Sequence, residues 1–131
     1  MAGETDLNIL LESLEPSLNL GSYVFISLKD INEILREDIL FQFKEEEGIT
    51  ILLSKDKADK YNLDYEFVAS WITLKVHSAL DAVGLTAAVS SALTKHNISC
   101  NVVAAYYHDH IFVSKKDTKK AMEVLSEFSR K

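Results

Sequence analysis

The order of the apolar patterns in the second half of the chain is the feature that most restricts its fold. Residues 67–77 are an apolar, aromatic and β-branched run typical of a buried strand, and residues 84–95 repeat apolar side chains at helical spacing. Residues 98–107 and 110–113 read as two further strands, close enough for an antiparallel hairpin. A Ser-x-x-Asp pattern that ends at Asp117 is typical of the start of a final helix. The order strand, helix, strand, strand, helix is that of a ferredoxin-like unit.

The first half repeats this order more weakly after a leading helix. Residues 6–14 place leucines at the spacing of a helix with one buried face, and Pro16 ends that pattern. The strands expected after it are residues 22–28, 39–44 and 49–54. The short helical segments expected between and after these strands are residues 30–36 and 55–61.

These patterns predict an α+β fold of two ferredoxin-like βαββα units, in which antiparallel sheets pack against helices. We expect the division to fall between residues 1–64, which include the leading helix, and residues 65–131. A chain of 131 residues is long enough for one compact domain or for two half-size modules.

Charge and cysteine content exclude several classes of function. The chain has 14 basic and 20 acidic residues, a net charge of −6, so sequence-independent binding to nucleic acid is not expected. Cys100 is the only cysteine, which excludes an intramolecular disulfide and a multi-cysteine metal cluster. No apolar run reaches the ~18 residues of a membrane helix, and no signal-peptide pattern opens the chain. We therefore expect a cytoplasmic protein without a membrane partner.

The turn between the first strand and the first helix of the second half carries a family resemblance. Residues 80–86, Leu-Asp-Ala-Val-Gly-Leu-Thr, resemble the Asp-x-Pro-Gly-x-Leu turn of ACT domains, which are small amino-acid-binding regulatory modules. Val83 stands where that motif usually has proline. Residues 71–113 and the opening segment 18–25 are also similar to an uncharacterised bacterial family of small tandem-ACT proteins. The resemblance implies two ACT-type units and a regulatory role.

The resemblance raises a question about the edge of the second sheet. A complete ACT unit ends with a fourth strand, and nothing after Phe128 supplies one. The second unit therefore borrows a strand, pairs with the first unit, or leaves an open edge, and open edges are usually covered. We expect pairing between units or between copies, and hence a homodimer.

The same turn is the candidate ligand site. Backbone N–H groups at a helix start bind anions such as an amino-acid carboxylate, and Gly84 allows the backbone to approach a ligand closely. Asp81 would bind the ligand's ammonium group; the alternative is that Asp81 caps the helix. The resemblance adds a facing wall from the second strand, where the Asn101 amide would orient a polar group. The candidate ligand-binding residues are Asp81, Ala82, Val83, Gly84, Leu85, Thr86, Asn101, Val102 and Val103.

Metal binding and catalysis are the competing interpretations. If the segment is extended, His108 and His110 share a face, and His77 would complete a set of imidazoles for zinc or nickel. The alternative, which we favour, is a hairpin turn in which Asp109 caps backbone amides, without a metal. Cys100 lies on the apolar alternation of a strand. Because the chain has no Gly-x-Ser-x-Gly elbow, P-loop or Rossmann glycine pattern, we expect neither an enzyme nor a cofactor.

The sequence thus predicts a non-enzymatic regulatory module of tandem ACT type that binds a small ligand, an amino acid by resemblance. Two alternatives remain: a protein-interaction or structural module without a small ligand, and a metal-binding protein that uses the three histidines. Burial of the Gly84 turn under side chains would favour the interaction module.

Overall fold

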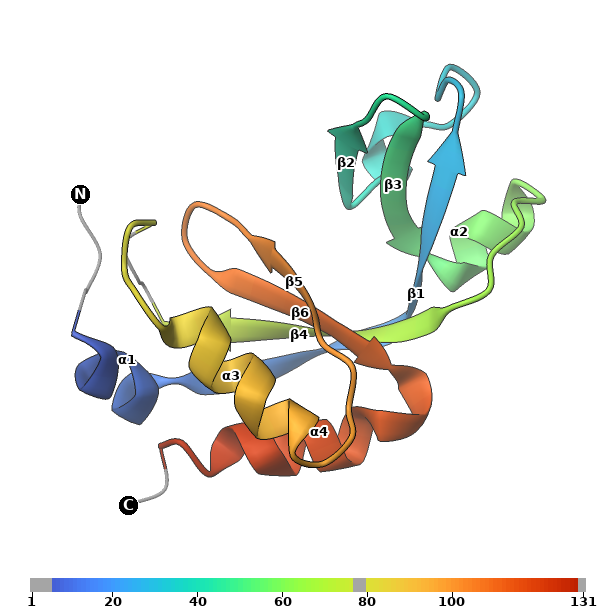
Figure 1. Ribbon diagram of the computed structural model, residues 1–131. Helices are drawn as coiled ribbons and strands as arrows, with labels where there is room; N and C mark the ends of the chain where they lie inside the picture. The colour runs from blue at the N-terminus through green and yellow to red at the C-terminus, as the bar shows by residue number, and fades with distance from the viewer. Residues whose placement is uncertain (1–5, 77–79, 130–131) are drawn as a thin grey trace. The chain divides into compact units, whose positions relative to one another are not determined.

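A computed structural model describes residues 6–76 and 80–129 of the chain. The chain forms two compact units (Figure 1). Unit 1 consists of Met1–Asn19 and Ser70–Lys131, and unit 2 consists of Leu20–Ala69. The two strands β1 (Glu15–Leu28) and β4 (Val68–Lys75) each begin in one unit and end in the other. Because of this exchange, residues 6–19 belong to the same compact unit as most of the C-terminal half. The division of the chain at residue 64 stays a prediction.

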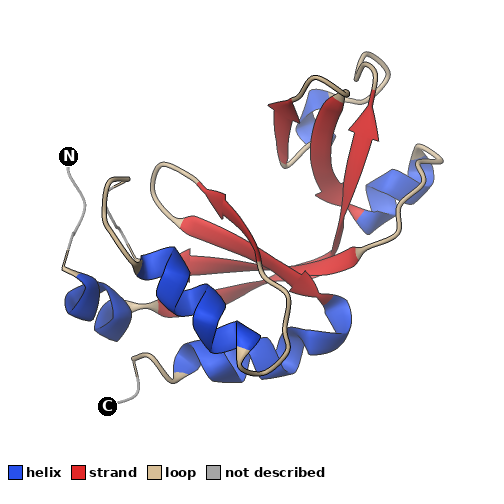
Figure 2. Cartoon of the chain, viewed as in Figure 1, coloured by secondary structure: helices blue, strands red, loops and turns tan. Residues whose placement is uncertain are grey.

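Unit 1 is a β-sheet that contains an antiparallel hairpin and has helices on one face. Besides residues 15–19 of β1 and most of β4, it contains α1 (Leu7–Ser13), α3 (Leu85–Thr94), β5 (Asn101–Ala104), β6 (Asp109–Ser114), the 3-10 turn η2 (Lys115–Asp117) and α4 (Thr118–Ser126). The strand order is β1-β4-β6-β5. Figure 2 shows α3 and α4 covering the same face of this sheet. This is the ferredoxin-like arrangement that the sequence predicts.

Unit 2 is a smaller sheet of the same type. It holds the rest of β1, the 3-10 turn η1 (Arg36–Asp38), β2 (Phe41–Lys44), β3 (Ile49–Ser54) and α2 (Lys55–Lys60). The strand order is β2-β3-β1, and both pairings are antiparallel. Val24, Ile26, Ile51 and Leu53 form its buried core, against which Ala58 of α2 packs. Mixed α/β units with antiparallel sheets are therefore present in both parts of the chain.

The fourth strand of unit 1 comes from the N-terminal segment. Residues 15–19 of β1 belong to unit 1, and β1 lies beside β4 in the sheet. The Asn19 side chain donates hydrogen bonds from Nδ2 to the Trp71 carbonyl (3.2 Å) and to Thr73 Oγ1 (3.0 Å). Directly after this segment, Gly21 has φ +99°, a conformation that bends a strand and favours glycine. Three alternatives were open for the edge of the second sheet. The structure shows the first of them, a borrowed strand, which residues 15–19 supply beside β4.

The core of unit 1 follows the expected helix and strand periodicities. Leu10 and Leu14 of the leading segment, Ile72 and Leu74 of β4, and the inner faces of α3 and α4 pack in one cluster of buried side chains. Asp6 caps α1 by accepting a hydrogen bond from the backbone N–H of Ile9 (3.2 Å). Helix α1 is thus part of the core of unit 1.

Several element bounds differ from the sequence predictions. The first strand begins at Glu15, not at residue 22, because the segment with Pro16 finds hydrogen-bonding partners on a distant strand. The helical turn expected over 30–36 is the shifted 3-10 turn η1. Ser114 makes no side-chain cap; the chain instead enters α4 through η2.

Other bounds are confirmed. Helix α2 and the β2–β3 hairpin lie where the patterns place them, and α3 occupies all but the ends of the expected range 84–95. Asn97, three residues after the end of α3, adopts a left-handed conformation with φ +59°. Local periodicity was therefore sufficient for these elements.

Truncating Leu10 tests whether α1 belongs to the core of unit 1. Leu10 is fully buried, whereas its neighbour Ile9 is 51% exposed on the same helix. We expect Leu10→Ala to lower the free energy of unfolding by about 2–5 kcal/mol, because it leaves a cavity. Ile9→Ala, the matched control, should change it by less than about 1 kcal/mol. Urea denaturation measures both, and equal effects would contradict the packing of α1 described here.

Candidate functional site

Helix α3 begins without a side-chain cap. Its N-cap residue is Gly84, which adopts a left-handed conformation with φ +101° and carries no side chain to bond the first turn. The first intrahelical hydrogen bond runs from the Ala88 N–H to the Gly84 carbonyl (2.9 Å). The backbone N–H groups of Leu85 and Thr86 precede that bond, so they point out of the helix start, where an anion is favoured. Asp81 lies three residues before the N-cap, so the alternative in which it caps the helix is wrong.

Gly84 has a structural role that the sequence analysis did not anticipate. A Cβ built on Gly84 would lie 3.1 Å from Cδ2 of Leu7, a residue of α1. The side of Gly84 that lacks a side chain therefore faces α1. Its positive φ also disfavours any other residue. A substitution at Gly84 would disturb the packing of α1 as well as any ligand.

The β5–β6 hairpin forms the opposite wall of the site. Its register pairs Ala104 with Asp109 and Val103 with His110. The turn is therefore residues 105–108, closed by a hydrogen bond from the Ala105 N–H to the His108 carbonyl (3.1 Å). The expected strands 98–107 and 110–113 are thus shorter and shifted, and Asp109 is the first residue of β6. The interpretation that Asp109 lies in the turn and caps its amides is wrong.

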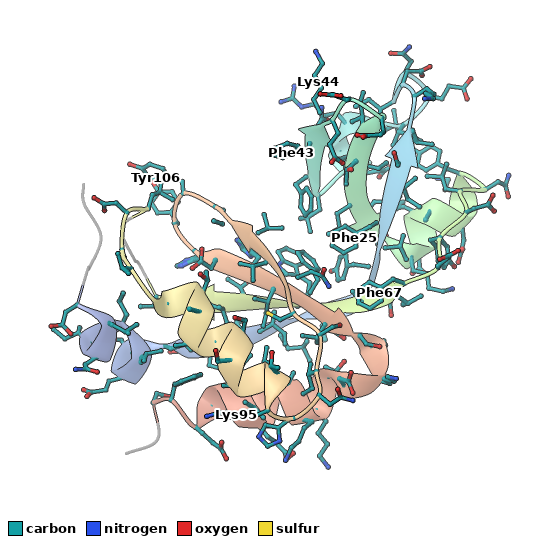
Figure 3. The ribbon with its side chains drawn as sticks, in the orientation of Figure 1. Phe25, Phe43, Lys44, Phe67, Lys95 and Tyr106 are labelled. Carbon is teal, nitrogen blue, oxygen red and sulfur yellow. The ribbon has the colours of Figure 1, made fainter. Side chains whose placement is uncertain are left out.

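A small pocket lies between the start of α3 and this hairpin. Its volume is about 170 Å³. The residues that line it are Leu80, Ala82, Leu85, Thr86, Ala104, Ala105 and Asp109. All of them belong to unit 1, and we call this space the turn pocket. Figure 3 shows Tyr106 at the tip of the β5–β6 hairpin.

The expected ligand-binding residues divide into two groups. Ala82, Leu85 and Thr86 line the turn pocket. The others do not: Asp81 is exposed, Val83 is 82% exposed, Gly84 faces Leu7, and Asn101, Val102 and Val103 lie on β5 beyond the lining. Asn101 instead donates a hydrogen bond from Nδ2 to the Phe112 carbonyl of the paired strand (3.3 Å).

Asp109 is the charged residue of the pocket lining, and the sequence analysis did not include it among the ligand-binding residues. Strand alternation places it on the same face as Ile111 and Val113, which are buried in the core beneath the helices. Burial raises the pKa of the Asp109 carboxyl, although His110 and His108 act in the opposite direction. Among residues 6–76 and 80–129, no hydrogen bond or ion pair is found for this carboxylate. A charged residue in phase with buried apolar neighbours is the signal that would have identified it.

The histidines do not form a metal site within the described residues. No group of three His, Cys, Asp or Glu side chains there could hold a metal ion. His77 lies outside the described residues. His108 lies in the hairpin turn, and its buried Nδ1 has no hydrogen-bond partner in the described part of the chain. His110 alternates with the core residue Ile111 and bonds Trp71, so it lies on the face of the sheet opposite the helices. His108 precedes β6, so the two histidines do not share a strand face.

His110 is the centre of a polar network on that face. Its Nδ1 accepts a hydrogen bond from the Trp71 indole N–H (3.0 Å) and lies 3.2 Å from Thr73 Oγ1, which in turn accepts from Asn19. This arrangement requires an unprotonated Nδ1. Burial, and next the charge of His108, lower the pKa of His110, and Asp109 opposes them. The network joins β1, β4 and β6.

Cys100 is unsuited to the role of a catalytic nucleophile. Burial raises the pKa of the Cys100 thiol to about 11, so the thiol is protonated at neutral pH and unreactive. Its side chain packs against the core of unit 1.

No described helix is long and apolar enough to span a membrane.

Unit 2 has a larger surface hollow of about 600 Å³ near η1 and β2. Its lining is Ile31, Ile34, Arg36, Ile39, Leu40, Phe41 and Gln42. None of these is an expected ligand-binding residue, and the one charged group, Arg36, is exposed. We favour the turn pocket because a helix start and a half-buried carboxyl line it together.

The His110 network predicts a pH-dependent stability. Because the folded-state pKa of His110 is below its usual value, its contribution is present above about pH 6.5 and is lost as the pH falls through the folded pKa. His110→Gln keeps an acceptor for Trp71 and should flatten this loss, whose size is about 1 kcal/mol, that of one hydrogen bond. Urea unfolding between pH 5 and 7, followed by the fluorescence of the single tryptophan, measures it.

The control for this prediction is His96→Gln, which removes an exposed histidine at the end of α3. That variant should retain the wild-type pH dependence. If His96→Gln and His110→Gln flatten the profile equally, the network is not its source.

Comparison with known proteins places both repeats in one family. The ACT domain description matches residues 2–70 through one family model and residues 66–127 through a second. A search of curated proteins found no match.

Solved structures extend the likeness to the whole chain. A protein of unknown function from Vibrio cholerae, described as a possible transport protein, is 44% identical, with a TM-score of 0.85 over 94% of this chain and 95% of that one. A protein from Agrobacterium tumefaciens is 20% identical, with a TM-score of 0.67 over 88% and 89% of the two chains.

The regulatory subunit of aspartate kinase from Thermus thermophilus shares the fold. It is 10% identical, with a TM-score of 0.62 over 86% of this chain and 95% of that one. With two matching domain descriptions that together span nearly the whole chain, this protein belongs to the ACT domain family.

Proposed function

We propose that this chain is a non-enzymatic regulatory module that binds a small amino acid in the turn pocket of unit 1. Family membership supports a regulatory, ligand-binding role. The observation that carries the proposal is the pocket itself, because the uncapped first turn of α3 forms one of its walls. The N–H groups of Leu85 and Thr86 are suited to a carboxylate.

The volume of the turn pocket limits the ligand. A cavity of about 150 Å³ is known to hold benzene, so 170 Å³ accommodates a molecule of similar size. The lining by Leu80, Ala82 and Ala104 is apolar around the polar helix start. Both properties favour an amino acid with a short side chain.

Regulation requires that the ligand prefers one arrangement of the protein over another. The turn pocket has walls from two segments that are distant in sequence, the turn before α3 and the β5–β6 hairpin. A ligand that contacts both would stabilise the arrangement in which they are close. We propose that the module acts in the cytoplasm as a homodimer, and that exposed apolar side chains near the pocket, such as Leu80, Val83 and Tyr107, contribute to that contact.

A protein-interaction module without a small ligand is the second candidate. The contact between Leu7 and Gly84 favours it, because this side of the turn is already covered within the chain. The two candidates differ in one observable property, which is stabilisation of the protein by an added amino acid.

A thermal-shift screen of the twenty amino acids at millimolar concentration tests the proposal. A ligand at 100 times its dissociation constant adds about 2.7 kcal/mol, a shift of several degrees at this size. Ala104→Leu should abolish the shift by filling the pocket, whereas the control Ala87→Leu, on the exposed side of α3, should retain it. If no amino acid shifts the wild-type protein, the interaction module is the better account.

A further inference from the structure

We infer that the turn pocket recognises an ammonium group, and that Asp109 is the residue that binds it. The inference rests on the proposed function only for the position of the pocket. It specifies a further property of the ligand, which is a positive charge at the end that lies away from the start of α3.

The position of Asp109 is fixed by the hairpin. The register Ala104 opposite Asp109 places both residues at the turn end of the β5–β6 hairpin, where both line the pocket. Since Asp109 lies in phase with the buried Ile111, its side chain is on the helix-covered face, the same side as the start of α3. Asp81, which the sequence suggested for this role, is exposed and does not line the pocket.

The surroundings of Asp109 leave its charge uncompensated. The carboxylate makes no hydrogen bond or ion pair in the described part of the chain. The charged groups that act on it are His110 and His108, and their effect is smaller than that of burial. His110 points to the opposite face, toward Trp71. An anionic group that is half-buried beside an empty volume and not neutralised by the protein is complementary to a cation.

The two ends of the pocket carry opposite electrostatic character. The start of α3 favours an anion at Leu85 and Thr86, and Asp109 favours a cation on the other wall. A molecule with a carboxylate and an ammonium group a short distance apart fits both, as a zwitterionic amino acid does. A carboxylic acid without an amine fits one end only.

The test uses the full-length protein labelled with ¹³C and ¹⁵N and follows the Asp109 carboxyl carbon and backbone amide by NMR. The probes are L-alanine, L-serine, ethylammonium, which has the amine alone, and propionate, which has the carboxylate alone. Binding of an ammonium group should lower the pKa of the Asp109 carboxyl relative to the free protein, because a cation then lies beside it. Propionate should leave that pKa unchanged or raise it.

Asp109→Asn is the decisive variant, because it keeps the shape and removes the charge. It should weaken binding of the amino acids roughly 10- to 100-fold, the range of one hydrogen bond to a charged group. Asp81→Asn distinguishes the two acids: a greater loss of affinity in Asp81→Asn than in Asp109→Asn would overturn the assignment. Asp64→Asn, an exposed change in unit 2, controls for net charge.

The stability of Asp109→Asn should also depend on pH in a way that a purely structural role of Asp109 would not produce. An acid whose folded-state pKa is raised favours folding below its unfolded pKa, and this advantage is lost as the pH rises through the folded value. Asp109→Asn should therefore raise the thermal midpoint at pH 7 and lose that gain at acidic pH. A lower midpoint at pH 7 would show that Asp109 serves the fold and would overturn the inference.

The outcomes separate this inference from the proposed function. Ethylammonium at Asp109 without any amino-acid binding supports the ammonium site and refutes the amino-acid module. Amino acids that bind Asp109→Asn and wild type equally support the module and refute the role of Asp109. If no probe changes the Asp109 signals, the inference is wrong; if L-alanine or L-serine binds and Asp109→Asn loses it, the inference is upheld.

Discussion

The contact between residues 15–19 of β1 and strand β4 is the constraint on which the rest of unit 1 depends. Without it β4 would present a row of unpaired backbone groups, and the sheet would have an open edge. Asn19 secures this contact by donating to the Trp71 carbonyl and to Thr73. The same segment continues from α1, whose Leu7 covers Gly84. One N-terminal segment therefore completes the sheet and also fixes the turn from which the pocket is built.

Strand register determines the chemistry of each face of the sheet. Asp109 and His110 are neighbours in sequence, yet alternation sends one toward the start of α3 and the other toward Trp71. A shift of one residue would exchange them, so that an imidazole would line the pocket and a carboxylate would face the indole. Pairing of Ala104 with Asp109 is thus a requirement of the site as well as of the hairpin.

Local periodicity predicted most of the elements, and long-range pairing accounts for what it missed. The leucines of α1 and the apolar spacing of α3 were sufficient to place both helices. Residues 15–19 have no such pattern; they form a strand because a partner 52 residues away accepts the Asn19 hydrogen bond. For the site, the sequence indicated the turn with Gly84. It placed the turn of the β5–β6 hairpin at residues 108–109, whereas the structure has it at residues 105–108. That error put Asp109 in the turn and concealed its alternation with Ile111.

An uncompensated carboxylate beside a pocket links ligand binding to stability. Burial of the Asp109 carboxyl costs free energy in the unliganded protein, since the nearby histidines offset only part of that cost. A cation bound beside it would recover this free energy as part of its own affinity. Because the wall that holds Asp109 and the wall that begins α3 come from different segments, a zwitterion gains its full binding energy only when both are in place. Such a ligand has the differential affinity for one conformation that regulation requires.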